Sequence, residues 1–175
     1  VKNNEIIGIK ILKNNSELDE ISTKNVILAV GHSSRDTFEM LYKRGVFLEQ
    51  KAFAVGVRIE HLQRNINLSR YGIEELPAVL SAADYKLAVH IGMGDQQRGV
   101  YTFCMCPGGY VVAATSEEHK VVTNGMSYFD RAGINANSAL LVEVKKSDFK
   151  SDHPLAGIEY QRKIEENAYI NGGKN

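Results

Sequence analysis

Short runs of alternating apolar and polar residues occupy much of the chain, a pattern typical of β-strands rather than helices. Near the N-terminus, residues 5–12 and 17–22 flank a polar turn at 13–16 and predict a hairpin. The continuous apolar run 26–31 predicts a strand covered on both faces. A helix is expected to follow this strand and to end at Gly45.

The rest of the chain predicts more strands and one further helix. Strands are expected over residues 52–61, 84–91, 99–106, 110–116, 120–123 and 139–145. Residues 63–80 carry turn-forming Gly and Pro and are expected to be irregular. Residues 92–98 predict a glycine-bearing loop, and 124–137 a long ordered loop. The clearest helical pattern covers 155–169. Together these elements predict an α+β fold with a mostly antiparallel sheet and few helices.

Composition narrows the classes of partner. Apolar residues make up 43% of the 175 positions, which suits a globular core. The 21 Lys and Arg residues balance the 21 Asp and Glu residues, which argues against duplex nucleic acid or an anionic membrane surface as a partner. There is no run of about 18 apolar residues that would predict a membrane span. With two cysteines and no expected signal peptide, we expect a reducing, cytoplasmic setting.

Both cysteines lie in one short run, YTFCMCPGG at 101–109. If this run is a regular strand, Cys104 and Cys106 point to the same face, because side chains two residues apart share a face. The chain then turns at Pro107. Gly108 and Gly109 carry no side chain, so another backbone or a flat ligand can come close there.

Several segments together resemble a known family. The apolar run 26–31 ends in Ala-x-Gly, a pattern found where the chain passes near FAD in flavoproteins with two dinucleotide-binding folds. More specific are GHSSRDT at 31–37, FAVGVRIEH at 53–61, FCMCPGG at 103–109, NGMSY at 124–128, NANSA at 135–139 and PLAGIEYQR at 154–162. In this order they resemble the bacterial and plastid proteins described as NAD(FAD)-utilising or FAD-dependent dehydrogenases, over essentially the whole chain.

The resemblance also implies that part of the protein is missing from this chain. Such flavoproteins begin with a strand, a Gly-x-Gly-x-x-Gly turn and a helix that bind the FAD pyrophosphate, and no such fingerprint occurs here. We therefore expect residues 1–45 to be part of an FAD-binding domain and 46–175 to be an inserted substrate-side domain. FAD would belong to the intact parent protein, the remainder of the FAD-binding domain would be a partner, and this fragment alone would bind little or no FAD. NAD(P) and a small-molecule substrate are further expectations.

The cysteine run and one strand supply the candidate catalytic residues: Cys104, Cys106, Arg58 and His61. The two thiols could lie beside the flavin, with a pKa lowered by Arg58, His61 or the Gly108 and Gly109 amides. Alternatively, they are small apolar residues that fill a strand. Arg58 suits a bidentate contact with a carboxylate or the flavin. No metal site is expected, because Cys-x-Cys lacks the ligand spacing of structural zinc and the five histidines are scattered.

Two further groups are candidate binding residues. For the cofactor they are Gly31, His32, Ser33, Arg35, Gly108 and Gly109. The first four follow the Ala-x-Gly strand, and a helix beginning at Arg35 offers free amides to a phosphate, or Ser34 and Asp36 simply cap that helix. For the substrate they are Asn124, Ser127, Arg131, Asn135 and Asn137, which are placed in one polar loop. Neutral amide and hydroxyl groups suit a polar substrate, although Asn and Gly also form ordinary turns.

The function that follows is a fragment of an FAD-dependent dehydrogenase that forms the substrate-side wall over the flavin. The fragment alone is expected to be inactive. Two alternatives stay open: a non-enzymatic binding module, and a thiol redox switch based on Cys104 and Cys106.

Overall fold

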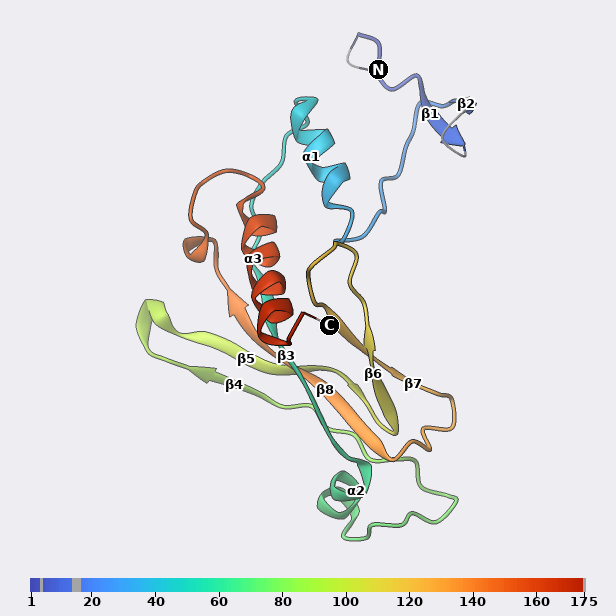
Figure 1. Ribbon diagram of the computed structural model, residues 1–175, viewed down its shortest axis with the longest axis vertical. Helices are drawn as coiled ribbons and strands as arrows, with labels where there is room; N and C mark the ends of the chain where they lie inside the picture. The colour runs from blue at the N-terminus through green and yellow to red at the C-terminus, as the bar shows by residue number, and fades with distance from the viewer. Residues whose placement is uncertain (4, 14–16, 175) are drawn as a thin grey trace. The chain divides into compact units, whose positions relative to one another are not determined.

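The computed structural model describes residues 1–3, 5–13 and 17–174, and it confirms the α+β class with mostly antiparallel strands. The chain divides into two compact units, Val1–Asp36 and Thr37–Asn175, which are described separately. Figure 1 labels their helices and strands. Among the described residues, no helix is both long and apolar enough to cross a membrane.

The first unit contains the predicted hairpin. β1 (Gly8–Lys13) pairs antiparallel with β2 (Glu17–Ser22), with Gly8 opposite Ser22. The turn that was expected at 13–16 lies largely outside the described residues. The strand expected over 26–31 is wrong: these residues have no regular structure. A strand needs a neighbour for its backbone groups, and within the described part of this unit only β1 and β2 pair.

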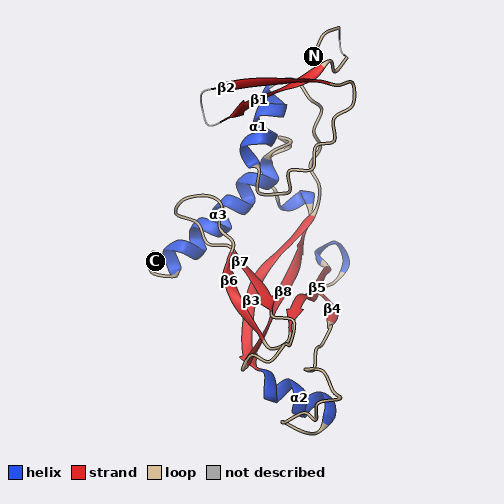
Figure 2. Cartoon of the chain, turned by 90° about the vertical axis from the view of Figure 1, so that its right-hand side faces the viewer, coloured by secondary structure: helices blue, strands red, loops and turns tan. Residues whose placement is uncertain are grey.

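A four-stranded antiparallel sheet forms the centre of the second unit. Its order is β3 (Phe53–Leu62), β8 (Asn135–Val144), β5 (Arg98–Cys106) and β4 (Ala88–Ile91). β8 is paired on both sides, which places its side chains between those of β3 and β5. Figure 2 shows these strands side by side, with α2 (Gln63–Tyr71) continuing from β3 at one end of the sheet.

A separate hairpin, β6 (Gly109–Ala113) with β7 (Thr123–Ser127), contacts the sheet mainly at β8 and β5. This corrects two expectations: the strand expected over 120–123 begins only at residue 123, and half of the long loop expected over 124–137 is strand. Asn and Gly are poor strand formers, so local propensity pointed to a loop. Pairing with β6 and close packing on the sheet override that propensity.

The helices match the sequence pattern in two cases and depart from it in one. α1 (Arg35–Lys43) is followed by Gly45 with a φ of 78°, and α3 (Ala156–Asn171) covers the predicted terminal helix. The expectation that 63–80 is irregular is wrong over α2. This helix ends at Gly72, whose φ of 76° is left-handed, so the breakers in this segment mark its end rather than its absence.

The apolar core lies where β3 and β8 meet α3. Val144, Phe149 and Ala156 are buried there, and Phe53 stacks on Phe149 with ring centroids 5.5 Å apart. Phe53 is paired with Val144 in the β3–β8 ladder, so both side chains face the same side of the sheet. Gly157 lets α3 approach closely, because a Cβ there would lie 3.1 Å from the Phe53 ring.

Two clusters of ion pairs tie the second unit together. Arg98 on β5 makes a bidentate pair with Asp148, with both N–O distances 2.6 Å, and Asp148 also accepts the Lys145 amide. Arg162 on α3 binds carboxylates from three segments: Glu39 at 2.9 Å, Glu117 at 2.8 Å and Glu159 at 3.0 Å. These contacts join α1 and the 114–122 segment to α3.

We expect Asp148→Asn to lower the melting temperature by a few degrees at neutral pH. Hydrogen bonds from Arg98 hold the pKa of Asp148 below its ordinary 3.8, so the ionised form stabilises the fold. This stabilisation is complete above pH 3.8, the pKa in the unfolded chain, and is lost as pH falls through the lower pKa of the folded protein. The melting temperatures of wild type and variant should therefore become equal in acid. Thermal unfolding by circular dichroism measures the effect, with the exposed Asp152→Asn as control. An equal loss in both variants would contradict the assignment.

Candidate functional site

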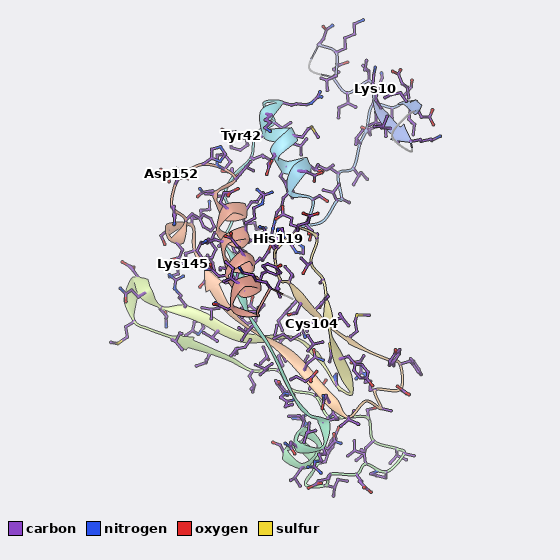
Figure 3. The ribbon with its side chains drawn as sticks, in the orientation of Figure 1. Lys10, Tyr42, Cys104, His119, Lys145 and Asp152 are labelled. Carbon is purple, nitrogen blue, oxygen red and sulfur yellow. The ribbon has the colours of Figure 1, made fainter. Side chains whose placement is uncertain are left out.

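The two cysteines lie at an irregularity near the end of β5. Phe103 pairs with Ala139 and Cys106 with Asn137, so two residues of β5 face the single residue Ser138 of β8. This is a β-bulge, and Cys104 within it has a φ of 47°, which is unusual for a residue other than glycine. The regular alternation assumed from the sequence does not hold here. Cys104, labelled in Figure 3, is exposed, whereas Cys106 is buried.

Arg58 connects the bulge to the central strand. Its Nη1 donates hydrogen bonds to the Cys104 carbonyl at 3.1 Å and to Asn137 Oδ1 at 2.7 Å. Arg58 is paired with Ala139 in the β3–β8 ladder, and Cys106 is paired with Asn137 in the β5–β8 ladder. Because Asn137 and Ala139 are two residues apart on β8, the side chains of Arg58, Asn137 and Cys106 lie on one face of the sheet. We call Arg58, Cys104, Cys106 and Asn137 the polar cluster.

The β6–β7 hairpin covers this polar cluster through a glycine. A Cβ on Gly125 would collide with Asn137 Oδ1 and Arg58 Nη1, and would lie 2.8 Å from the Cys106 Sγ. Ser127, at the end of β7, donates to the Pro107 carbonyl at 2.8 Å and fixes the hairpin to the turn after β5. Gly125 is therefore required for the site. The one indication in the sequence is that a glycine occurs within a segment that the structure shows to be a strand, where glycine often marks a close approach.

Two donors of the polar cluster are buried without an acceptor among the described residues: Arg58 Nε and Asn137 Nδ2. Asn137 is 0% exposed, so its amide cannot turn to solvent. A buried donor that lacks an acceptor costs about 1–3 kcal/mol. Such a cost is retained where the group orients its neighbours or meets an acceptor that another molecule supplies.

The environment of Cys106 favours the protonated thiol. Burial is the main cause that raises its pKa, and the neighbouring Cys104 raises it further. Arg58 and Ser127 act in the opposite direction with smaller effect. The Arg58 charge is therefore present, as the sequence suggested, but it does not outweigh burial at Cys106.

His61 lies apart from the polar cluster. It is an odd number of residues from Arg58 along β3, so it faces the other side of the sheet. Its Nε2 is 2.7 Å from the Tyr85 hydroxyl, and its buried Nδ1 has no partner within the described ranges. Burial raises the pKa of Tyr85. The structure thus does not bring the predicted pair Arg58 and His61 together.

Gly108 serves packing within the chain. Its amide donates to Gln63 Oε1 at 2.8 Å, and its carbonyl accepts the Gly133 amide at 3.1 Å. A Cβ on Gly108, whose φ is 52°, would collide with the Arg131 carbonyl. Gln63 is buried and also bonds Asn67, and sequence reasoning missed it because it lies in the segment expected to be irregular.

The five polar residues placed in one loop lie in two strands and the segment between them: Asn124 and Ser127 in β7, Arg131 between the strands, and Asn135 and Asn137 in β8. Asn124 accepts the Gly125 amide at 2.8 Å, Ser127 ends β7, and Asn135 donates to Glu60 at 2.9 Å from β8. Arg131 is exposed, with a φ of 51°, and lines a cavity of about 680 Å³ beside α2. Only Asn137 belongs to the polar cluster, so a shared substrate role for all five remains a prediction.

The predicted cofactor residues at 31–35 form a turn in the first unit. Gly31 has a φ of 75°, His32 lies 3.4 Å from the Ser33 hydroxyl, and the Arg35 amide donates to the Ser33 carbonyl at 2.9 Å. Ser34 donates to the Val30 carbonyl at 2.9 Å. α1 begins directly after this turn, and a cofactor role for it remains a prediction.

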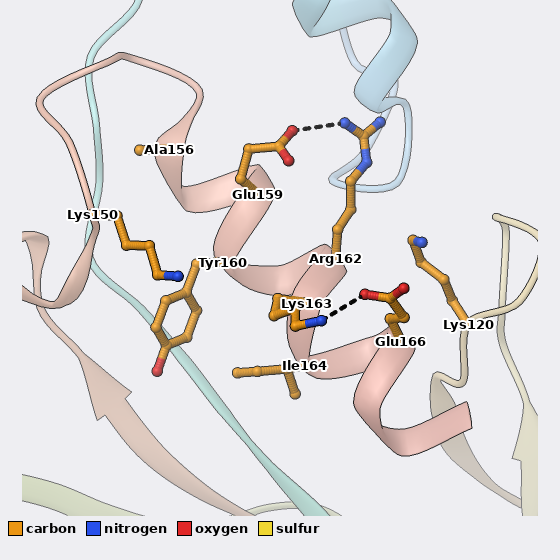
Figure 4. Close-up of a pocket in the computed structure, with 9 residues that line it drawn as sticks. All are labelled: Lys120, Lys150, Ala156, Glu159, Tyr160, Arg162, Lys163, Ile164 and Glu166. Atoms are coloured by element: carbon orange, nitrogen blue, oxygen red, sulfur yellow. Dashed lines mark hydrogen bonds and ion pairs between the residues drawn. The ribbon is translucent and has the colours of Figure 1, made fainter. Parts of the chain in front are cut away.

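A second cavity, of about 550 Å³, lies along α3 (Figure 4). Lys120 and Lys150 line it, together with Lys163 in an ion pair with Glu166 at 3.0 Å. None of the polar cluster lines this cavity. Among the described residues, no group of three His, Cys, Asp or Glu side chains is placed to hold a metal ion.

Comparison with known proteins identifies the family. Residues 52–175 match the family model described as FAD-dependent protein, C-terminal domain-like. The chain belongs to this family. It is also 54% identical over 155 residues to an uncharacterized protein from Clostridium beijerinckii (strain ATCC 51743 / NCIMB 8052). That match covers 89% of this chain but only 29% of the relative. The polar cluster and the β6–β7 hairpin both lie inside the matched region, which marks them as parts of a flavoprotein.

We expect Gly125→Ala to destabilise the second unit by about 1–3 kcal/mol, the usual cost of overpacking. The added methyl group would collide with the polar cluster beneath the hairpin. Gly99→Ala on β5 is the matched control, because no atom lies within 4 Å of its Cβ position. Urea unfolding of both variants measures the difference. Equal midpoints would show that the hairpin does not pack on the cluster as described.

Proposed function

We propose that this chain forms the substrate-side wall over the flavin in an FAD-dependent oxidoreductase of the dehydrogenase type. The observation that carries the proposal is the polar cluster, in which the Cys104 carbonyl and Asn137 fix the Arg58 cation, and two buried donors have no acceptor among the described residues. Its position within the FAD-dependent family match supports the same conclusion.

The residues of the cluster fit a flavin or an anionic substrate. A flavin ring and a carboxylate both present acceptor oxygens. The guanidinium of Arg58 is a planar donor group whose Nε has no acceptor in the described part of the chain. Asn137 is fully buried under Gly125, so it orients Arg58 rather than touching a ligand. Arg58, which is half-buried, is therefore the group that contacts the acceptor.

Each residue then has a defined task. When bound, FAD supplies the redox chemistry by accepting or donating an electron pair. Arg58 holds and orients an acceptor atom through its positive charge, because the Cys104 carbonyl and Asn137 prevent it from rotating. The hairpin excludes water from Asn137 and Cys106. Exposed Cys104 lies at the edge of the site.

The remaining assignments complete the proposal. Gly31, His32, Ser33 and Arg35 lead into α1 and would contribute to the FAD site, together with parts of the longer protein outside this chain. The match covers only 29% of the relative, which leaves ample length for the rest of the FAD-binding domain. NADH or NADPH and a small-molecule substrate would be the reactants.

The full-length protein is expected to purify with bound flavin, visible by its absorbance, and the absorbance should bleach with NADH, NADPH or a member of a small-molecule panel. Bleaching without loss of flavin would support an oxidoreductase. A full-length protein that holds no flavin, even after refolding with FAD, would contradict the proposal. Flavin that no reductant or substrate bleaches would contradict the dehydrogenase assignment.

Arg58→Lys is expected to lower kcat/KM of the full-length enzyme about tenfold, or about 1.4 kcal/mol of transition-state stabilisation. Lysine keeps the charge but loses the planar donor group and Nε. The control is Arg70→Lys, at an exposed position of α2. Flavin content and melting temperature are measured for both, so that a folding defect is recognised. Unchanged kinetics in a folded Arg58→Lys enzyme would remove Arg58 from the site.

A further inference from the structure

The bulge brings the two thiols together without placing them in equivalent surroundings. The Cys106 Sγ lies 3.3 Å from the Cys104 carbonyl oxygen, so the Cys106 side chain folds back toward residue 104. Cys104 is also one of the groups that raise the pKa of Cys106, which agrees with this approach. In a regular strand, residues two apart are separated along its length, whereas here the extra residue and the left-handed φ of Cys104 depart from that geometry.

The surroundings of the two thiols differ in the way that a two-cysteine redox pair requires. Cys104 is exposed, so a solute can reach it. Cys106 is 7% exposed and lies beneath Gly125, which keeps it from dissolved oxidants. One thiol that meets an oxidant and a protected neighbour that closes the bond are the two components of such pairs.

We propose that Cys104 and Cys106 form a reversible disulfide, in which exposed Cys104 reacts first with a hydroperoxide and buried Cys106 completes the bond. This inference does not depend on the flavin or on the proposed dehydrogenase activity. It concerns this chain's own thiols and can be tested without turnover.

The steps balance as a two-electron oxidation. The Cys104 sulfur attacks one oxygen of the hydroperoxide, the O–O bond breaks, and the other oxygen takes up the Cys104 thiol proton and leaves as an alcohol or as water. The Cys104 sulfur now carries a hydroxyl group as a sulfenic acid. The Cys106 sulfur attacks the Cys104 sulfur, the S–S bond forms, the S–O bond breaks, and hydroxide leaves as water with the Cys106 proton. The thiols lose two electrons and the peroxide gains them, and a dithiol reverses the reaction.

Oxidation would also change the polar cluster. The Cys106 Sγ lies next to the position of Gly125, and the Cys104 carbonyl accepts a hydrogen bond from Arg58. Drawing the two sulfurs together moves both groups. Oxidation of the pair would thus shift the position of Arg58 and of the hairpin above it.

The test treats the full-length protein with hydrogen peroxide, alkylates the remaining thiols, and analyses tryptic peptides by mass spectrometry. Arg98 and Lys120 bound a tryptic peptide, residues 99–120, that contains both cysteines and no other cleavage site. The expected product is this peptide, lighter by two hydrogen atoms, resistant to alkylation, and restored by dithiothreitol. Oxidation of Met105 instead adds an oxygen atom and is therefore distinguished by mass.

Two matched variants assign the roles. Cys106→Ser should leave Cys104 as a sulfenic acid that dimedone traps, whereas Cys104→Ser should protect Cys106 from peroxide. In the untreated protein, Cys104 should alkylate at least about tenfold faster than Cys106, because burial and a raised pKa slow the latter. Full alkylation of both thiols after peroxide would overturn the proposal. So would a disulfide to another cysteine, or equal oxidation of Cys106 in Cys104→Ser.

Discussion

The close approach of the β6–β7 hairpin to the four-stranded sheet is the constraint on which the candidate site depends. At Gly125 the missing side chain leaves room for the Arg58 guanidinium, the Asn137 amide and the Cys106 thiol. Polar groups taken out of water must be held by one another, because an unmade hydrogen bond there is costly. The hairpin thus converts a long, flexible arginine into a cation with a fixed direction.

The sheet of the second unit has an apolar end and a polar end. Where Phe53 pairs with Val144, the ladder packs against Phe149 and α3 and forms the core. Toward the other end of β3 and β8, two polar residues, Asn137 and Ser138, are buried between the small residues Ala136 and Ala139. The apolar end supplies stability without directionality. The polar end supplies directed donors, which suits it to hold a ligand in one orientation.

The β-bulge gives Cys104 two roles at once. Its left-handed backbone directs the carbonyl to Arg58, while its side chain stays exposed next to a buried thiol. A chemical change at the Cys104 sulfur can therefore affect Arg58 through the Cys104 backbone and its carbonyl hydrogen bond. Strained backbone of this kind persists only where surrounding contacts enforce it, and here the β8 ladder and Arg58 do so.

The sequence by itself determined the fold class, the terminal helix, the N-terminal hairpin and most strands of the sheet, because apolar periodicity depends on local spacing. It also singled out Arg58, Asn137 and the Cys-x-Cys run, which do meet in one cluster. It placed Asn137 in a loop and paired Arg58 with His61, since neither strand register nor the face of the sheet can be read from local pattern.

Only the tertiary structure decided that residues 124–127 and 135–138 are strand, that 26–31 is not, and that Cys104 and Cys106 differ in exposure. Each of these outcomes depends on a partner distant in the sequence: β6 for Asn124 and Gly125, and β8 for the bulge. Backbone hydrogen bonds and burial are completed by such partners, so they override the weak preferences of Asn, Gly and apolar runs.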